Sequence, residues 1–242
     1  MKTRLSSAHD VFFWFDPSDR PPLLFHHVPK TAGTSFRSAA VDAFARAGAL
    51  RLSIENLRRR LRENKRRPND IRPLIHRLVE LGPLAGMMSH YTALVDDLPM
   101  PILALVREPE AQLWSWANFK ATVHNRFTPE EIAARSSNMQ IKSLTGAEDI
   151  PAERPEGDIA PYIELVDRAV ARYRLFATAE FSKLLEYCGD TYGLRIEAGR
   201  REKDRGNQTK LNAGIARGLK AHLRNRDPVW LDRILYQRVT GA

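Results

Sequence analysis

The uninterrupted apolar run at residues 101–106, Pro-Ile-Leu-Ala-Leu-Val, constrains the fold more than any other stretch. A strand that is apolar at every position has no solvent-facing side, and such strands belong to parallel sheets that are covered on both faces. Shorter apolar runs at 23–25, 84–88 and 175–178 predict further strands, with helical patterns between them. This alternation predicts an α/β fold, with a three-layer arrangement around a central parallel sheet.

The chain has 242 residues, which is enough for one domain with a sizeable core, and we expect residues 1–242 to form a single domain. Its core is expected at about 21–240, with residues 1–20 as an N-terminal segment at the edge. The spacing of leucine and isoleucine over 52–64 predicts a helix, and residues 71–81 repeat that pattern.

A polar stretch at residues 26–35 joins the first of these strands to a helical pattern that starts at Phe36. The N-terminus of a helix has backbone N–H groups without partners and a partial positive charge, so it attracts phosphate or sulfate. Gly33 allows the backbone to approach an anion closely, and Lys30 adds a positive charge. Further donors are the hydroxyls of Thr31, Thr34 and Ser35. The alternative interpretation is a plain strand-to-helix turn, and the order is not that of the nucleotide triphosphate loop GxxxxGK[ST].

Two more polar positions follow predicted strands. Arg107 comes directly after the run at 101–106, and Ser115 follows about two helical turns later, so the pair could bind a phosphate. His90 follows the run at 84–88, and a histidine can accept a hydroxyl proton near pH 7. The alternative is that Arg107 and His90 only cap the ends of their strands. His124 is an alternative to His90 as the base. Ligands bind at the carboxyl ends of parallel strands, so we expect the loop, His90 and Arg107 to converge there.

The chain carries 38 Lys and Arg against 29 Asp and Glu, a formal net charge of +9. This excess favours anionic partners: nucleic acid, an anionic lipid surface, a polyanionic glycan or a nucleotide. Much of it lies between Arg51 and Arg77, which is either a solvated helix face or a binding surface. No apolar run approaches the roughly 20 residues of a membrane span, and no signal peptide is evident, so a cytoplasmic protein is expected. The single cysteine, Cys188, excludes an internal disulfide.

Residues 28–35, Val-Pro-Lys-Thr-Ala-Gly-Thr-Ser, closely resemble the 5′-phosphosulfate loop of sulfotransferases that use 3′-phosphoadenosine 5′-phosphosulfate (PAPS). The resemblance is greatest to the carbohydrate branch with the heparan sulfate and uronyl 2-O-sulfotransferases, whose loop reads roughly HxPKTGGTS. Residues 106–116 resemble that family's 3′-phosphate motif, roughly RDPxxRxxS, with Glu108 and Gln112 as departures. His90 matches the histidine of a Gly-His pair that serves as the catalytic base. Weaker resemblances cover 138–146 (NxQxxxLxG), 173–184 and 232–236 (DxxLY).

The resemblance implies a P-loop nucleotide-kinase-like fold and a sulfotransferase that moves the sulfuryl group from PAPS to a hydroxyl of an acceptor, with a carbohydrate as the first expectation and no metal. The implied catalytic residues are Lys30 and His90. The implied PAPS-binding residues are Lys30, Thr31, Ala32, Gly33, Thr34, Ser35, Arg107 and Ser115. Animal relatives sit behind a membrane anchor, so its absence suggests a bacterial enzyme or a truncated chain.

Two alternatives stay open. A nucleotide or small-molecule kinase could use the same loop geometry, and a non-enzymatic module could bind polyanions through the region 51–77. Nucleic acid is not the expected partner of a sulfotransferase, for which the basic region could instead guide an acidic glycan. A polysaccharide, a glycolipid, a small glycoside and a peptide tyrosine are all open as acceptors, and the oligomeric state is open too.

Overall fold

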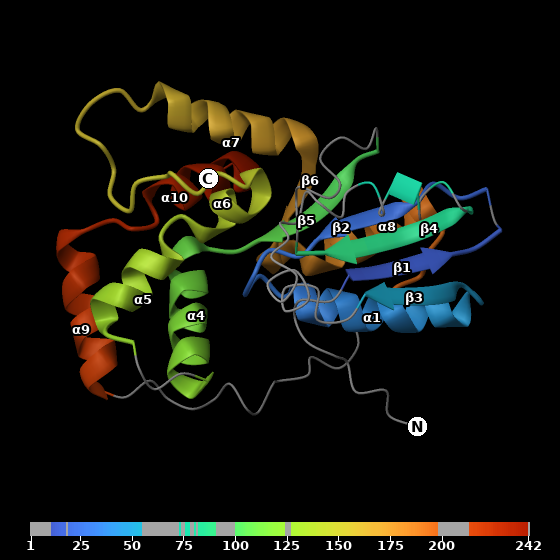
Figure 1. Ribbon diagram of the computed structural model, residues 1–242, viewed down its shortest axis with the longest axis horizontal. Coiled ribbons are helices and arrows are strands. Elements are labelled where there is room, and N and C mark those ends of the chain that lie inside the picture. Colours follow the sequence, from blue (N-terminus) through green and yellow to red (C-terminus); the bar gives the residue numbers. More distant parts are fainter. Residues whose placement is uncertain are drawn as a thin grey trace.

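The computed structural model describes an α/β fold built on one six-stranded sheet (Figure 1). It describes residues 11–17, 19–54, 82–90, 100–123, 127–197 and 213–241, with Pro73, His76, Arg77 and Glu80. The strands are β1 (Val11–Phe15), β2 (Leu23–His26), β3 (Leu50–Ile54), β4 (Leu84–Ser89), β5 (Ile102–Val106) and β6 (Tyr173–Ala177). The helices are α1 (Gly33–Arg46), α4 (Pro109–Val123), α5 (Pro129–Ser136), α6 (Met139–Thr145), α7 (Ala160–Arg172), the short 3-10 helix η3 (Thr178–Glu180), α8 (Phe181–Tyr192), α9 (Ala213–Asn225) and α10 (Trp230–Thr240).

The sheet has the strand order β3-β1-β4-β2-β5-β6. It is mixed, whereas a parallel sheet was expected from the sequence. Strands β4, β2, β5 and β6 run parallel to one another. In this part, His26 of β2 lies opposite Ser89 of β4 on one side and Ala104 of β5 on the other. The parallel part therefore consists of the four predicted strands, and their carboxyl ends share one edge of the sheet.

Strand β1 corrects the expectation that residues 1–20 lie at the edge. It lies between β3 and β4 and is antiparallel to both, and Val11 and Phe13 are fully buried. Only residues 16–22 connect β1 to β2, whereas two parallel strands need a crossover of about a dozen residues or more. The chain therefore has to reverse direction between these strands, which makes the sheet mixed.

Strand β3 occupies the start of the segment that was expected to be a helix over 52–64. Leu50, Leu52 and Ile54 alternate along the chain, so they also fit the two-residue period of a strand, and pairing with β1 favours that period. Residues 55–72, with most of the basic stretch between Arg51 and Arg77, lie outside the described residues. So do His124 and the basic loop Arg200–Asn207.

Helices cover both faces of the sheet, as a three-layer arrangement requires. Side chains such as Phe13 and Leu24 pack with α6, α7 and α10 on one face, while their neighbours Trp14 and Leu23 pack with α1 and α8 on the other. Alternation of this kind follows from the pleat, which points successive side chains to opposite faces. A third apolar cluster joins α4, α5 and α9, which stand together beside the sheet (Figure 1).

None of the described helices is both long enough and apolar enough to cross a membrane.

Candidate functional site

The predicted site residues follow the carboxyl ends of three of the four parallel strands, β2, β4 and β5. Arg107, directly after β5, donates a hydrogen bond from Nη1 to the carbonyl of Lys30 in the loop after β2, at 3.3 Å. The ring of His90, directly after β4, stacks on the ring of His27 at the start of that loop, with 4.0 Å between centroids. The loop, His90 and Arg107 thus lie together at one edge of the sheet.

The loop backbone adopts an unusual conformation at two of its residues. Lys30 and Ala32 have φ angles of 65° and 63°, in the left-handed region that glycine normally occupies. A left-handed residue followed by right-handed ones turns successive N–H groups toward one side, which forms a concavity that binds anions. Strained backbone of this kind persists where surrounding contacts enforce it, and it concentrates at functional sites.

Side chains from neighbouring elements hold two successive loop carbonyls. The carbonyl of Pro29 accepts from Gln112 Nε2 on α4 at 2.8 Å, and that of Lys30 accepts from Arg107. Oγ1 of Thr178, just after β6, donates to the carbonyl of Val106 at 2.9 Å and lies 3.5 Å from the carbonyl of Thr31. These contacts fix the loop in its strained form. Gln112 stands where the resembling family usually has an arginine, and here it is buried and holds the loop.

The loop ends in the N-terminus of α1. The first N–H groups of a helix have no acceptor within that helix, and the cap residue, Ala32, offers no side-chain hydrogen bond. Thr34 and Ser35 are exposed, whereas Thr31 is buried and donates its hydroxyl to the carbonyl of Val28 at 2.9 Å. The Thr31 hydroxyl therefore closes the turn. Thr31 can contribute to anion binding only through its main-chain N–H.

One face of α4 borders the loop. Gln112 contacts the carbonyl of Pro29, and the ring of Phe119 lies beneath Lys30, with 4.9 Å from Nζ to the ring centroid. Ser115 is half-buried between them on the same helix. Residues three and four positions apart share a face of a helix, so Ser115 faces the loop too.

Gly33 is the first residue of α1, and the ring of His27 occupies the space beside it. A Cβ atom added at Gly33 would lie 2.0 Å from His27 Cδ2, far inside van der Waals contact. The glycine is therefore required by the close packing of loop and helix, in addition to any approach of an anion.

A crevice with no room for a water molecule adjoins the two stacked histidines. It is lined by Phe25, His27, Arg37, Met88, Ser89 and His90. Arg37 was not singled out from the sequence, although it lies one helical turn after Gly33 and so on the same face of α1. It is buried, and its guanidinium lies 5.4 Å from the ring centroid of Phe12.

His26 and His27 are both buried and neutral. Burial lowers the pKa of His26 from its ordinary 6.5 to about 4, against an opposing hydrogen-bond effect of the Ser143 backbone. The Nε2 atom of His26 lies 3.0 Å from Ser143 Oγ. Burial also lowers the pKa of His27 well below 6.5, with further lowering from the charges of His90 and Arg37. Neither imidazole is protonated near pH 7.

These two histidines predict an acid-sensitive fold. Unfolding returns them to water, so at these two sites the unfolded chain binds more protons than the folded chain below pH 6.5. The stability that the histidines contribute is therefore complete above pH 6.5 and is lost as the pH falls toward 4, by up to about 1.4 kcal/mol per pH unit for each histidine. Buried Asp232, whose pKa is raised to about 7, contributes a pH dependence of the opposite sign. Urea unfolding of the wild type and of a His26→Gln variant across this range isolates the share of His26, and the slope of the variant is expected to be lower by up to about 1.4 kcal/mol per pH unit. An unchanged slope in that variant would contradict the prediction.

A second set of buried groups fixes the main chain of Arg107. The amide of Gln140 on α6 accepts from the Arg107 N–H at 2.7 Å and donates to the Arg107 carbonyl at 2.8 Å. The carboxylate of Asp232 on α10 in turn accepts from the N–H groups of Gln140 and Ile141, at 3.0 and 2.8 Å. Burial raises the pKa of Asp232 to about 7, while these two N–H groups act to lower it.

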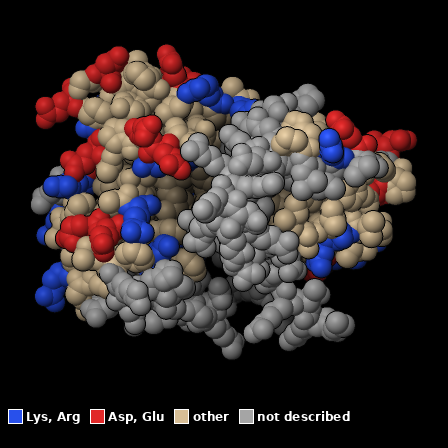
Figure 2. Space-filling model, in the orientation of Figure 1, with Lys and Arg blue, Asp and Glu red and all other residues tan. Residues whose placement is uncertain are grey.

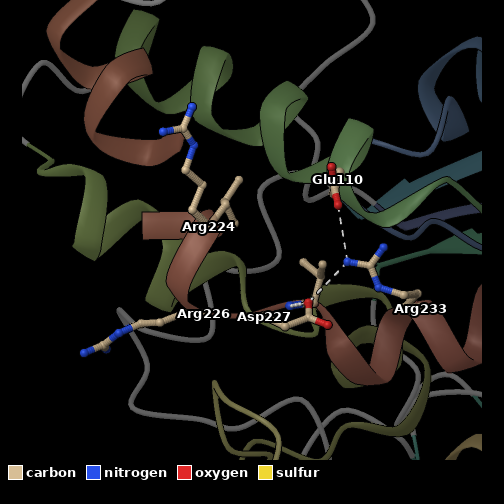
Figure 3. A pocket seen from close by; sticks show the side chains of 7 residues that line it. Glu110, Arg224, Arg226, Asp227 and Arg233 are labelled. Atoms are coloured by element: carbon tan, nitrogen blue, oxygen red, sulfur yellow. Dashed lines mark hydrogen bonds and ion pairs between the residues drawn. The ribbon is translucent and has the colours of Figure 1, made fainter. Parts of the chain in front are cut away.

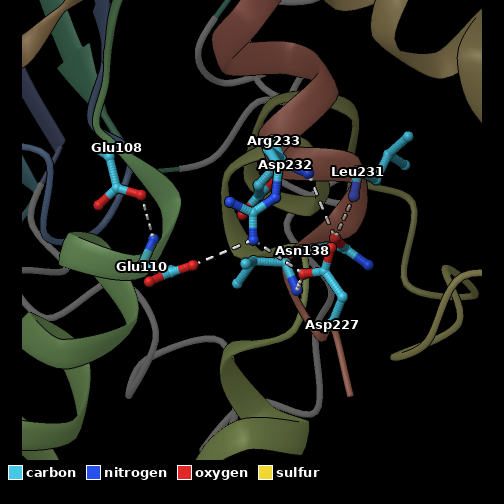
Figure 4. A network of polar contacts seen from close by, with 8 residues as sticks. Glu108, Glu110, Asn138, Asp227, Leu231, Asp232 and Arg233 are labelled. Atoms are coloured by element: carbon cyan, nitrogen blue, oxygen red, sulfur yellow. Dashed lines mark hydrogen bonds and ion pairs between the residues drawn. The ribbon is translucent and has the colours of Figure 1, made fainter. Parts of the chain in front are cut away.

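Polar contacts around the first turns of α4 and α10 extend this framework (Figure 4). Asn138 accepts at Oδ1 from the N–H of Leu231 at 2.9 Å, and Glu108 accepts from the first N–H groups of α4. At this edge, carboxylates thus cap α4 and α6, whereas α1 has no side-chain cap. The segments 138–146 and 232–236 carried only weak resemblances, and the structure gives their polar residues a role in holding Arg107.

A cavity of about 350 Å³ lies between α4, α9 and α10 (Figure 3). Arg233 there is paired with Glu110 at 3.3 Å and Asp227 at 3.4 Å. Arg224 and Arg226 also line the cavity, but their guanidinium groups point away from Arg233 in Figure 3. No predicted site residue lines this cavity, and its cations do not converge on one point.

Comparison with known proteins adds no family to this description. No protein-family model matches the chain, and no curated protein matches its sequence. Among the described residues, no group of three His, Cys, Asp or Glu side chains is placed to hold a metal ion. The interpretation of the site therefore depends on the residues at the sheet edge and on their geometry.

Proposed function

We propose that this chain is a PAPS-dependent sulfotransferase of the carbohydrate type, with a P-loop nucleotide-kinase-like fold. The observation that carries the proposal is the hydrogen bond from Arg107 to the carbonyl of Lys30. It joins the two segments that resemble the 5′-phosphosulfate and 3′-phosphate motifs of that family. A ligand with two anionic groups close together fits this pairing, and PAPS, with its 3′-phosphate and 5′-phosphosulfate on one ribose, is such a ligand.

In this proposal the loop N–H groups and Lys30 bind the 5′-phosphosulfate, while Arg107 and Ser115 bind the 3′-phosphate. His90 takes the proton of the acceptor hydroxyl as its oxygen attacks sulfur in line. The bond from sulfur to the bridging phosphate oxygen breaks, and 3′-phosphoadenosine 5′-phosphate (PAP) leaves. Lys30 stabilises the charge that develops on the bridging oxygen, an electrostatic effect that is usually the largest in group transfer. A sulfuryl group carries less charge than a phosphoryl group, so we propose transfer without a metal.

The polyanion-binding alternative depends on a concentration of positive charge. On the face shown in Figure 2, acidic and basic side chains are interspersed over the described surface. The basic residues of 55–72 are not among the described residues. The kinase alternative would need a lysine after the loop glycine, where this chain has Thr34.

Calorimetric titration with PAP and with ADP, each with and without magnesium, tests the proposal. We expect PAP to bind without metal and ADP to bind weakly, because ADP lacks the 3′-phosphate. Arg107→Ala is expected to weaken PAP binding roughly 10- to 100-fold, the loss of a charge-assisted hydrogen-bond pair. Arg238→Ala, at an exposed arginine of α10, is the control and should leave PAP binding unchanged.

Each other outcome points to an alternative. Preference for ADP with magnesium would indicate a kinase. Binding of neither nucleotide, together with salt-dependent binding of heparin, would indicate a polyanion-binding module.

A further inference from the structure

His27 contacts both halves of the proposed site. Its backbone N–H donates to the carbonyl of Ser89 at 2.8 Å, immediately before His90. Its ring lies 4.0 Å from the ring of His90, at an interplanar angle of 28°. On the loop side, the same ring fills the space next to Gly33. One buried imidazole thus connects the proposed base to the first residue of the anion-binding helix.

The neighbouring histidine, His26, faces the other way. Its Nε2 pairs with Ser143 Oγ on α6 at 3.0 Å, and its ring lies 5.8 Å from that of Tyr173. Successive residues of extended chain point to opposite sides, which explains the divergence. Both histidines are buried, so His26 provides a matched control for substitutions at His27.

The chemistry of the stack favours a fixed role for His27. Its ring is held between Gly33 and His90, with 6% of the residue exposed, and it has no room to approach a substrate. A neutral His27 ring allows the neighbouring imidazole of His90 to gain a proton, whereas a charged His27 ring would repel the protonated His90. His90 is more exposed than His27, as a residue.

We infer that His27 is a positioning residue that orients the imidazole of His90 and links it to the anion loop through Gly33. The inference depends on the proposed function for the role of His90 as the base. Binding of an anion at the N-terminus of α1 is then expected to change the surroundings of the His90 ring through the ring of His27, without direct contact between the anion and His90.

Histidine Cε1–Hε1 spectra of the full chain test this inference, with the His90 signal assigned by a His90→Gln variant. In the wild type, the ring current of His27 should shift the His90 signal upfield. His27→Leu should remove this shift, and His27→Phe should keep it because a flat ring is retained. His26→Leu should leave it in place. Thermal unfolding shows whether each variant is folded, and His27→Met, which also lacks a ring, takes the place of His27→Leu if that variant does not fold.

Addition of PAP supplies the second arm of the experiment. The wild type and His27→Phe should show a change in the His90 signal, whereas His27→Leu should lose that change while calorimetry still detects PAP. The inference would be overturned by an unchanged His90 signal in His27→Leu, or by an equal change in His26→Leu. Failure of the proposed function is a separate result, since it appears as a wild type that does not bind PAP.

Discussion

Gly33→Ala is expected to destabilise the protein by about 3 kcal/mol and to weaken PAP binding at least roughly tenfold. The added Cβ would lie 2.0 Å from Cδ2 and 2.5 Å from Nε2 of His27. The short, buried side chain of His27 cannot retreat, because its other face is stacked on His90. The start of α1 must therefore shift, which displaces the N–H groups that are proposed to bind the 5′-phosphosulfate. Urea unfolding and calorimetry with PAP measure the two effects.

Gly189→Ala in α8 is the matched control. An added Cβ there meets no atom within 4 Å, and the residue lies in a helix. Alanine should therefore stabilise this position by up to about 1 kcal/mol, with PAP binding unchanged. A Gly33→Ala protein as stable as the wild type, with intact PAP binding, would contradict the close packing of His27 against α1.

Gln140→Leu is expected to cost about 3 kcal/mol of stability and to reduce the preference for PAP over ADP. Leucine fills a similar volume but leaves both the N–H and the carbonyl of Arg107 without the Gln140 amide, and each lost partner of a buried group costs roughly 1–3 kcal/mol. The main chain of Arg107 should then loosen, and the guanidinium should bind the 3′-phosphate less well. The ratio of PAP to ADP affinity reports this second effect.

Gln237→Leu, the same change at an exposed position of α10, provides the comparison and should alter stability by less than about 0.5 kcal/mol. If Gln140→Leu lowers stability but leaves the PAP-to-ADP ratio as in the wild type, Gln140 supports the fold and does not position Arg107 for a ligand.

The α/β class and the four parallel strands could be predicted because their signals are local. The apolar run ending at Val106 and the glycine at the start of α1 need no knowledge of distant residues. The edge at which the loop, His90 and Arg107 meet then follows from the shared direction of parallel strands. The convergence of these three segments could therefore be predicted, although their exact contacts could not.

Features that depend on pairing between distant segments could not be predicted in the same way. The apolar residues of β1 fit an edge strand and an interior strand equally well. The position of β1 is determined by its pairing with β3 and β4. Ile54 of β3 fits both the two-residue period of a strand and the helical spacing of Leu57 and Leu61. The exchange between Gln140 and Arg107 spans 33 positions in the sequence, and nothing near either residue indicates it.

The interior position of β1 has a consequence for synthesis of the chain. Val11, Phe12, Phe13 and Trp14 are all nearly inaccessible in the finished fold, yet β4, which covers one side of β1, is made much later. At a synthesis rate of roughly 5–20 residues per second, the ribosome delivers β4 several seconds after β1. During that interval, at least one edge of β1 is unpaired and its apolar side chains are not fully covered. Such a strand aggregates or recruits chaperones. The speed of translation between residues 16 and 89 is thus expected to influence the yield of folded protein.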